Sequence, residues 1–135
     1  MFSRILELIR VRQYVKNLFV FCGILFAVNP SISLLFDVLL VFISFCLASS
    51  CVYVFNDLRD LESDKNHPKK KHRPLAGGYL SKKTAIYVIF VLLVFLVLLM
   101  GFLSSVATTI ICIYLFQNVY NNQPYYNNKI LLLYK

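Results

Sequence analysis

The sequence predicts an all-α protein, a polytopic membrane helical bundle with about four transmembrane helices. The chain has 135 residues, is 59% hydrophobic and has a mean hydropathy of +0.71, whereas soluble domains contain fewer apolar residues. Charged residues are absent from three long stretches, 17–36, 38–56 and 84–128. Uncharged apolar segments of about 18 or more residues are typical of membrane-spanning helices. The lipid bilayer is therefore the first partner that the sequence predicts.

The first two predicted spans lie on either side of a proline. Span one covers residues 17–28 and ends before Pro30, because proline disfavours helical conformation at the residue that precedes it. Span two covers residues 34–55. A basic segment followed by a short apolar run also resembles a secretory signal, but the basic segment is long and no A-x-A cleavage site follows it.

The third apolar segment is too long for one crossing. As a single helix, residues 84–120 would extend roughly 55 Å, whereas the hydrocarbon core of a bilayer is about 30 Å thick. Gly101 and the two serines that follow at 104 and 105 predict a turn, with spans near 85–100 and 106–119. Ser81 is a candidate cap for the helix that enters the first of these.

The net charge of +8 does not indicate nucleic-acid binding, because the basic residues flank the apolar spans and do not line a helix face. Apart from Arg59, they form three groups: Arg4, Arg10, Arg12 and Lys16; Lys65, Lys69, Lys70, Lys71, Arg73, Lys82 and Lys83; and Lys129 and Lys135. The connector at 29–33 carries no charge. By the positive-inside rule, the N-terminus, the acidic loop after the second span and the C-terminus are expected to be cytoplasmic.

A polar block between the second and third spans joins spaced carboxylates to a basic run. Asp57, Asp60 and Asp64 are three and four residues apart, so a helix of 3.6 residues per turn places them on one face. Mg²⁺ prefers oxygen ligands and often shares them with substrate phosphates. The cations that follow at 69–71 and 73 are suited to hold phosphate oxygens. The block predicts diphosphate chemistry at a membrane edge.

Two simpler interpretations of this block stay open. It could be a charged juxtamembrane loop that determines topology, in a four-helix membrane protein that is not an enzyme. Its basic run could also attract anionic lipid, at about 1 kcal/mol per residue near the surface.

The order of these elements resembles the UbiA superfamily of intramembrane prenyltransferases. Its first Asp-rich signature is similar to N-D-x-x-D-x-x-x-D at 56–64, followed by R-P-L-A-x-G at 73–78. The resemblance is closest to the decaprenyl-phosphate phosphoribosyltransferase branch. It rests there on R-x-x-Q-x-x-K-N at 10–17, A-S-S-x-V-Y-V at 48–54 and D-x-x-H-P-K-K at 64–70.

The resemblance implies a partial UbiA-type fold and a set of site residues. Residues 1–120 are expected to be the N-terminal part of a transferase domain, and the Asn-rich tail 121–135 a truncated or frame-shifted end. The implied ligands of Mg²⁺–diphosphate are Asn56, Asp57, Asp60 and Asp64, of which the three aspartates are the catalytic candidates. The implied substrate contacts are Lys16, Asn17, Asn56, Lys70 and Arg73.

The implied reaction is phosphoribosyl transfer from phosphoribosyl diphosphate to polyprenyl phosphate. The alternative within the family is transfer of a polyprenyl group to an aromatic acceptor. Val11 and Tyr14 depart from the branch, which usually has Pro and Trp at these places. Family members are also longer and carry a second Asp-rich motif, whereas this chain has no acidic residue after Asp64. The isolated chain is therefore expected to be inactive, or to need a complementing C-terminal half.

Overall fold

The computed structural model describes residues 1–27 and 31–121, and this part of the chain is all helical, as predicted. Its elements are α1 (Phe2–Leu8), η1 (Val11–Phe21), α2 (Cys22–Leu25), α3 (Ile32–Arg59), α4 (Leu61–Asn66), η2 (Lys70–His72), α5 (Lys82–Met100) and α6 (Ser105–Asn121). The predicted atypical tail lies outside the described residues, except for Asn121.

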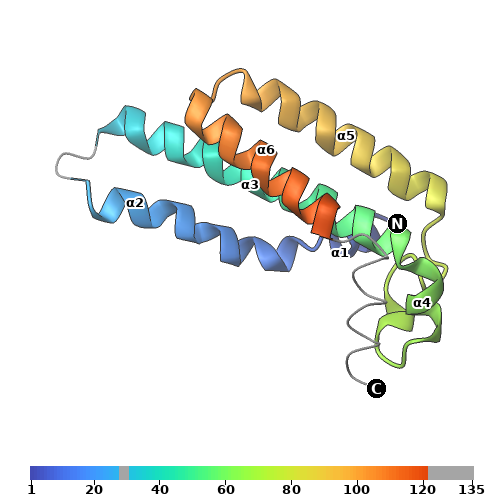
Figure 1. Cartoon of the computed structure of the whole chain (residues 1–135). Helices are drawn as coiled ribbons and strands as arrows, with labels where there is room; N and C mark the ends of the chain where they lie inside the picture. Colours follow the sequence, from blue (N-terminus) through green and yellow to red (C-terminus); the bar gives the residue numbers. More distant parts are fainter. Residues whose placement is uncertain (28–30, 122–135) are drawn as a thin grey trace.

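Helix α3 is the centre of the arrangement, since η1, α5 and α6 all pack against it. The long helices run lengthwise in Figure 1, while α1, α4 and the loop before α5 gather at one end of the bundle. This end is called the polar end below. The last residues of α2 and the first of α3 lie at the opposite end.

Two serines begin the long helices. The Ser31 hydroxyl accepts a hydrogen bond from the Leu34 amide at 3.2 Å, and Ser81 accepts one from the Thr84 amide at 3.1 Å. Each bond satisfies an amide that has no partner within its helix. The cap predicted at Ser81 is confirmed. The turn predicted at Gly101 is also confirmed, because α5 ends at Met100.

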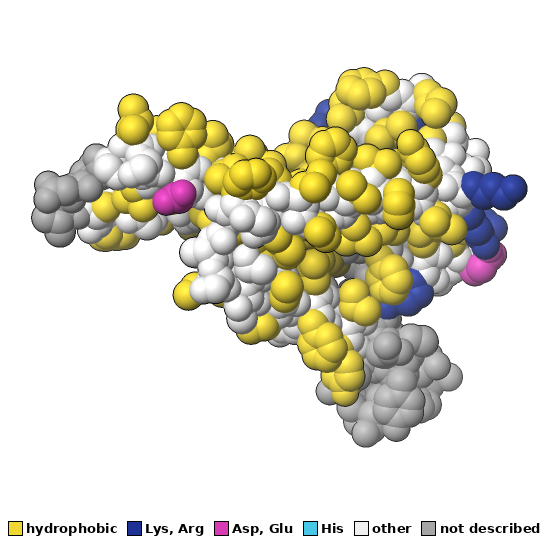
Figure 2. All heavy atoms as spheres, turned by 90° about the horizontal axis from the view of Figure 1, so that it is seen from above, with side chains coloured by type: hydrophobic (Ala, Val, Ile, Leu, Met, Phe, Trp, Pro, Cys, Tyr) yellow, Lys and Arg dark blue, Asp and Glu magenta, His cyan; other side chains and the backbone are white. Residues whose placement is uncertain are grey.

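The two helices α3 and α5 are long and apolar enough to cross a membrane, with hydropathies of 2.5 and 2.7. Only 11% of the apolar window of α5 is buried, compared with 44% for α3. A core helix of a soluble protein would be mostly buried. In Figure 2, hydrophobic side chains cover the visible face along the helices, and the cations lie mainly toward one end. Such a surface fits lipid better than water.

The first predicted span has an unexpected form. Its residues fold as the 3₁₀ helix η1, eleven residues long, followed by the four residues of α2. A 3₁₀ helix rises about 2.0 Å per residue, compared with 1.5 Å for an α-helix, so η1 is roughly 22 Å long. For the same number of residues, η1 is therefore longer than an α-helix. Crossing of the membrane by η1–α2 and by α6 stays a prediction.

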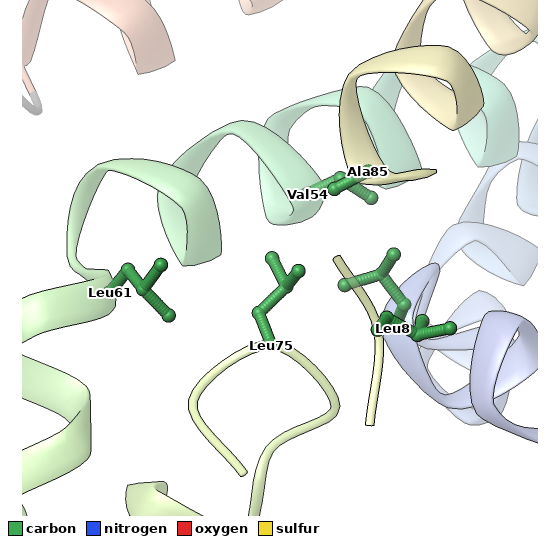
Figure 3. Packing of buried hydrophobic residues seen from close by; sticks show 6 residues of the cluster. Leu8, Val54, Leu61, Leu75 and Ala85 are labelled. Carbon is green, nitrogen blue, oxygen red and sulfur yellow. The ribbon is translucent and has the colours of Figure 1, made fainter. Parts of the chain in front are cut away.

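Two hydrophobic clusters hold the helices together. The larger one joins α1, α3, α4, the loop and α5 at the polar end, through Leu8, Val54, Leu61, Leu75, Leu80 and Ala85 (Figure 3). The smaller one joins α3, α5 and α6 through Ala48, Leu96 and Ile111. Ala48 is fully buried, and its small side chain permits close approach of neighbouring helices.

We predict that Gly78→Ala destabilises the protein by about 1–2 kcal/mol, because Gly78 has the left-handed φ of +73° that disfavours a Cβ. Gly23→Ala is the matched control, since a Cβ at either glycine meets nothing within 4 Å. Gly23 lies in helix α2, so alanine is expected to be neutral or slightly stabilising there. Unfolding titrations with SDS in mixed micelles measure both. Equal stabilities of the two variants would contradict the prediction.

Candidate functional site

The end of α3 and the start of α4 place two carboxylates on one side. The backbone bonding continues almost unbroken across the junction, with Asp60 N donating to Asn56 O and Asp64 N to Asp60 O, each at 2.8 Å. Seven residues make about two helical turns, so Asp57 and Asp64 face the same way. Their exposed fractions are 3% and 2%.

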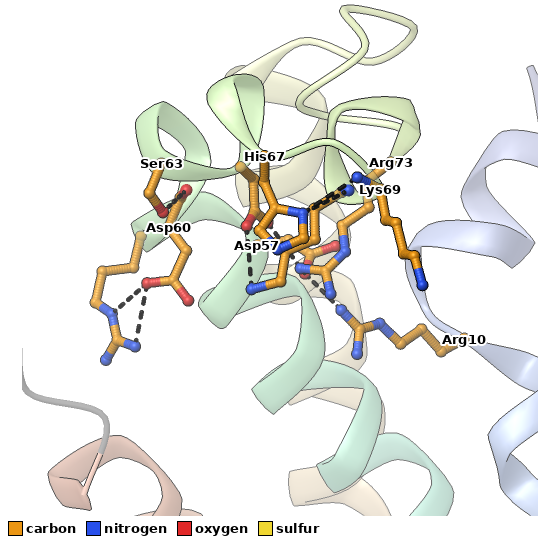
Figure 4. A network of polar contacts seen from close by, with 10 residues as sticks. Arg10, Asp57, Asp60, Ser63, His67, Lys69 and Arg73 are labelled. Atoms are coloured by element: carbon orange, nitrogen blue, oxygen red, sulfur yellow. Dashed lines mark hydrogen bonds and ion pairs between the residues drawn. The ribbon is translucent and has the colours of Figure 1, made fainter. Parts of the chain in front are cut away.

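The loop after α4 returns Arg73 to these carboxylates. Its Nη1 donates to Asp57 Oδ1 at 3.2 Å and to Asp64 Oδ2 at 2.7 Å (Figure 4). The ammonium group of Lys70 lies 3.4 Å from Asp64 Oδ1. The loop is held in place by Leu75, which is buried in the larger hydrophobic cluster. The distances place Lys70 and Arg73 beside Asp57 and Asp64, while their role as substrate contacts stays a prediction.

Arg10 provides the third cation and comes from the junction of α1 and η1. Its Nη2 donates to Asp57 Oδ1 at 2.6 Å, and its guanidinium lies 4.6 Å from the centre of the Tyr53 ring. Arg10 has a φ of +54°, the left-handed conformation that residues other than glycine seldom adopt. Sequence reasoning did not select Arg10 as a site residue. The available signal was its position as the first residue of the R-x-x-Q-x-x-K-N stretch.

The cluster of Arg10, Asp57, Asp64, Lys70 and Arg73, called the charge cluster below, has more cations than carboxylates. Asp64 Oδ1 is buried and accepts no hydrogen bond from the described residues, although the Lys70 ammonium lies nearby. The cluster thus offers positive charge for an anion and a carboxylate oxygen for a hard cation.

A cavity of about 810 Å³ opens beside the charge cluster. This volume falls in the range of small-molecule sites. The lining includes three arginines and two carboxylates among its residues, which are Ser3, Leu6, Glu7, Arg10, Val11, Arg12, Gln13, Asp57, Arg73 and Pro74. The arrangement suits a polyanionic ligand of small-molecule size.

The other predicted site residues are not members of the charge cluster as defined above. Asp60 is partly exposed and pairs with Arg59 at 3.3 Å. Asn17 donates to Cys46 Sγ at 3.3 Å and lies 3.4 Å from Ser49 Oγ. Ser49 is roughly 12 Å along α3 from Asp57, at about 1.5 Å per residue. Lys16 is exposed on η1, and Asn56 is half-buried on α3.

The predicted four-residue metal cage is not gathered in the described residues. Within 1–27 and 31–121, no three His, Cys, Asp or Glu side chains come together as metal ligands. Asp57 and Asp64 are instead joined through the guanidinium of Arg73. Their oxygens still fit a hard cation in donor type, and Asp64 Oδ1 lacks a hydrogen-bond donor.

Residues 17–131 match the UbiA prenyltransferase family. The chain belongs to this family. Prenyltransferases of the UbiA family are generally metal-dependent. Together with the apolar helices α3 and α5, this membership makes the chain an integral membrane protein.

Three bacterial relatives of this UbiA-family chain are named decaprenyl-phosphate phosphoribosyltransferase. The protein of Mycolicibacterium smegmatis is 41% identical over 81 residues, which are 56% of this chain and 26% of the relative. That of Corynebacterium glutamicum is 34% identical over 111 residues, 80% and 33% of the two chains. That of Mycobacterium tuberculosis is 39% identical over 93 residues, which are 65% of this chain and 31% of the relative. The matched part is thus a third or less of each relative.

We predict that Asp57→Asn destabilises the fold by about 3 kcal/mol, since it leaves Arg10 and Arg73 partly buried without their shared carboxylate. Asp60→Asn is the control and is expected to cost less than about 1 kcal/mol, because its ion pair with Arg59 is more exposed. SDS unfolding titrations compare the variants. Equal losses of stability would argue against a buried charge cluster.

Proposed function

We propose that this chain is the N-terminal part of a Mg²⁺-dependent membrane transferase, which moves a phosphoribosyl group from phosphoribosyl diphosphate to polyprenyl phosphate. The observation that carries the proposal is the charge cluster beside a cavity of about 810 Å³. The names of the three relatives support the choice of substrates. Because the chain spans a third or less of these relatives, the complete activity is assigned to a longer assembly.

The carboxylates would hold the metal ion. Asp57 and Asp64 offer buried oxygens, Asp60 lies between them in the sequence, and Asn56 directly precedes Asp57. Bound Mg²⁺ would supply positive charge to the diphosphate oxygens as the leaving group departs.

The arginines would exchange partners when substrate binds. Arg10 and Arg73 now neutralise Asp57, and a diphosphate in the cavity would present oxygens to the same guanidinium groups. Guanidinium groups bind phosphate oxygens in a bidentate manner. Their transfer to the substrate would leave the carboxylates available as ligands.

The residues would then act by electrostatic stabilisation. As the bond from ribose C1 to the diphosphate breaks, negative charge grows on the leaving oxygens and positive charge on C1. Guanidinium groups that already contact the bound diphosphate need little reorganisation to stabilise the leaving group. The acceptor would approach from the bilayer, along which α5 exposes its apolar side chains.

Two other functions are alternatives to phosphoribosyl transfer, and experiments must distinguish them from it. Prenyl transfer to an aromatic acceptor would use the same acids and cations, but a prenyl diphosphate as donor. A membrane protein without enzymatic activity would bind neither diphosphate. The sequence after Asp64 has no carboxylate, so we further propose that a complementing C-terminal half supplies additional acids.

We predict that the chain, purified in lipid nanodiscs, binds phosphoribosyl diphosphate only when Mg²⁺ is present. Asp64→Asn should weaken this binding by about tenfold or more, because a charged contact at the ligand is lost. Glu62→Gln is the matched control, since Glu62 is exposed and pairs only with lysines in the described residues. Isothermal titration measures the affinities. Absence of binding in the unaltered chain, or tighter binding of a prenyl diphosphate, would refute the proposed donor.

We also propose that the N-terminus and the acidic loop are cytoplasmic. In a background without the native cysteines, Lys71→Cys should react with a membrane-impermeant maleimide only in inside-out vesicles. Ser31→Cys, at the other end of α3, should react in intact cells. Both positions are exposed, so burial does not distinguish them. The reverse labelling pattern would invert the proposed orientation.

A further inference from the structure

A line of polar contacts joins η1 to α3 within otherwise apolar surroundings. The two sequence stretches that meet here are 10–17 and 48–54. Ser50 lies at their centre and is fully buried. A hydroxyl buried at this position is stable only with hydrogen-bond partners, and these identify its role.

Ser50 contacts the chain on both sides of Arg10. Its Oγ lies 3.1 Å from the carbonyl oxygen of Ile9, the residue directly before Arg10. The Tyr14 hydroxyl, four residues after Arg10, lies 2.8 Å from the same Oγ. The same Oγ lies 2.8 Å from Cys46 O in the preceding helical turn, so its single proton is shared between the Ile9 and Cys46 carbonyl oxygens. Three groups thus converge on one hydroxyl.

The residue between these contacts is held in an unfavourable conformation. Arg10 has a φ of +54°, which costs about 1–2 kcal/mol in a residue other than glycine. Such a conformation persists only when the surrounding contacts enforce it. Its effect is to send the guanidinium group past the Tyr53 ring to Asp57 Oδ1 at 2.6 Å.

We propose that Ser50 is a positioning residue of the charge cluster. It contacts the Ile9 carbonyl before Arg10 and the Tyr14 side-chain hydroxyl after it, and so keeps Arg10 in the left-handed conformation that directs its guanidinium group to Asp57. Ser50 itself does not reach the cavity, whose lining includes Arg10 but not Ser50. The effect of Ser50 on ligand affinity rests on the proposed function, whereas its effect on the backbone at Arg10 does not.

The test uses Ser50→Ala in the full chain in lipid nanodiscs, with Ser44→Ala as the matched control. Ser44 is also a fully buried serine of α3, but among the described residues its hydroxyl donates only to the Leu40 carbonyl of the same helix. Tyr14→Phe is the second variant, because it removes one hydroxyl contact from outside α3 and keeps the ring.

Hydrogen–deuterium exchange of the peptide covering residues 9–16 reports on the backbone directly. We expect exchange there to accelerate on the order of tenfold in Ser50→Ala, and less in Tyr14→Phe, because hydrogen bonds that hold the segment are lost. Ser44→Ala should leave this peptide unchanged. Unaltered exchange in Ser50→Ala, or equal acceleration in Ser44→Ala, would overturn the proposal.

Binding of phosphoribosyl diphosphate with Mg²⁺ tests the consequence. Ser50→Ala should weaken binding several-fold in the normal chain and have no further effect when combined with Arg10→Ala, because Ser50 acts through Arg10. Additive losses would overturn the positioning role. If the unaltered chain does not bind but Ser50→Ala still accelerates exchange, the proposed function fails while the hold of Ser50 on the Arg10 backbone stands.

Discussion

Neutralisation of two buried carboxylates is the constraint around which the polar end is built. Transfer of a carboxylate out of water costs several kcal/mol unless cations and hydrogen bonds replace the solvent. Arg73 meets this need for Asp57 and Asp64 together, and Arg10 completes it at Asp57. Each cation comes from a different segment, so the ion pairs also determine where the α1–η1 junction and the loop lie.

Hydrophobic packing at the same end makes the ionic arrangement possible. Leu8 of α1 and Leu75 of the loop pack with Val54 and Leu61 of α3 and α4. The segments that carry Arg10 and Arg73 are therefore anchored within a few residues of the cations. A flexible loop would lose more conformational entropy on binding a charged ligand, whereas an anchored one has already lost it.

The groups that contact α3 change along its length, from charged near Asp57 to apolar near Ala48. Near Asp57 the partners are guanidinium groups, and near Ser50 they are hydroxyl and carbonyl groups. At Ala48 the partners are the aliphatic side chains of Leu96 and Ile111. Helix α5 turns most of its surface away from the protein, consistent with a role at the lipid boundary. The charge cluster thus lies at the polar end of a helix whose other contacts are increasingly apolar.

Local rules were enough to predict the all-helical class, the turn at Gly101 and the cap at Ser81, because these follow from hydropathy and from backbone chemistry of neighbouring residues. The spacing of Asp57, Asp60 and Asp64 predicted one face for all three, but tertiary contacts decided which partner each of these residues has. Arg73 joins Asp57 to Asp64, whereas Asp60 pairs with Arg59. Asn17 of η1 contacts Ser49, farther along α3 from the aspartates. The role of Arg10 could be seen only in the fold. The direction of its side chain depends on a left-handed backbone conformation and on partners about 40 residues away in the sequence. Residue patterns do not indicate which residues at such a separation lie close together.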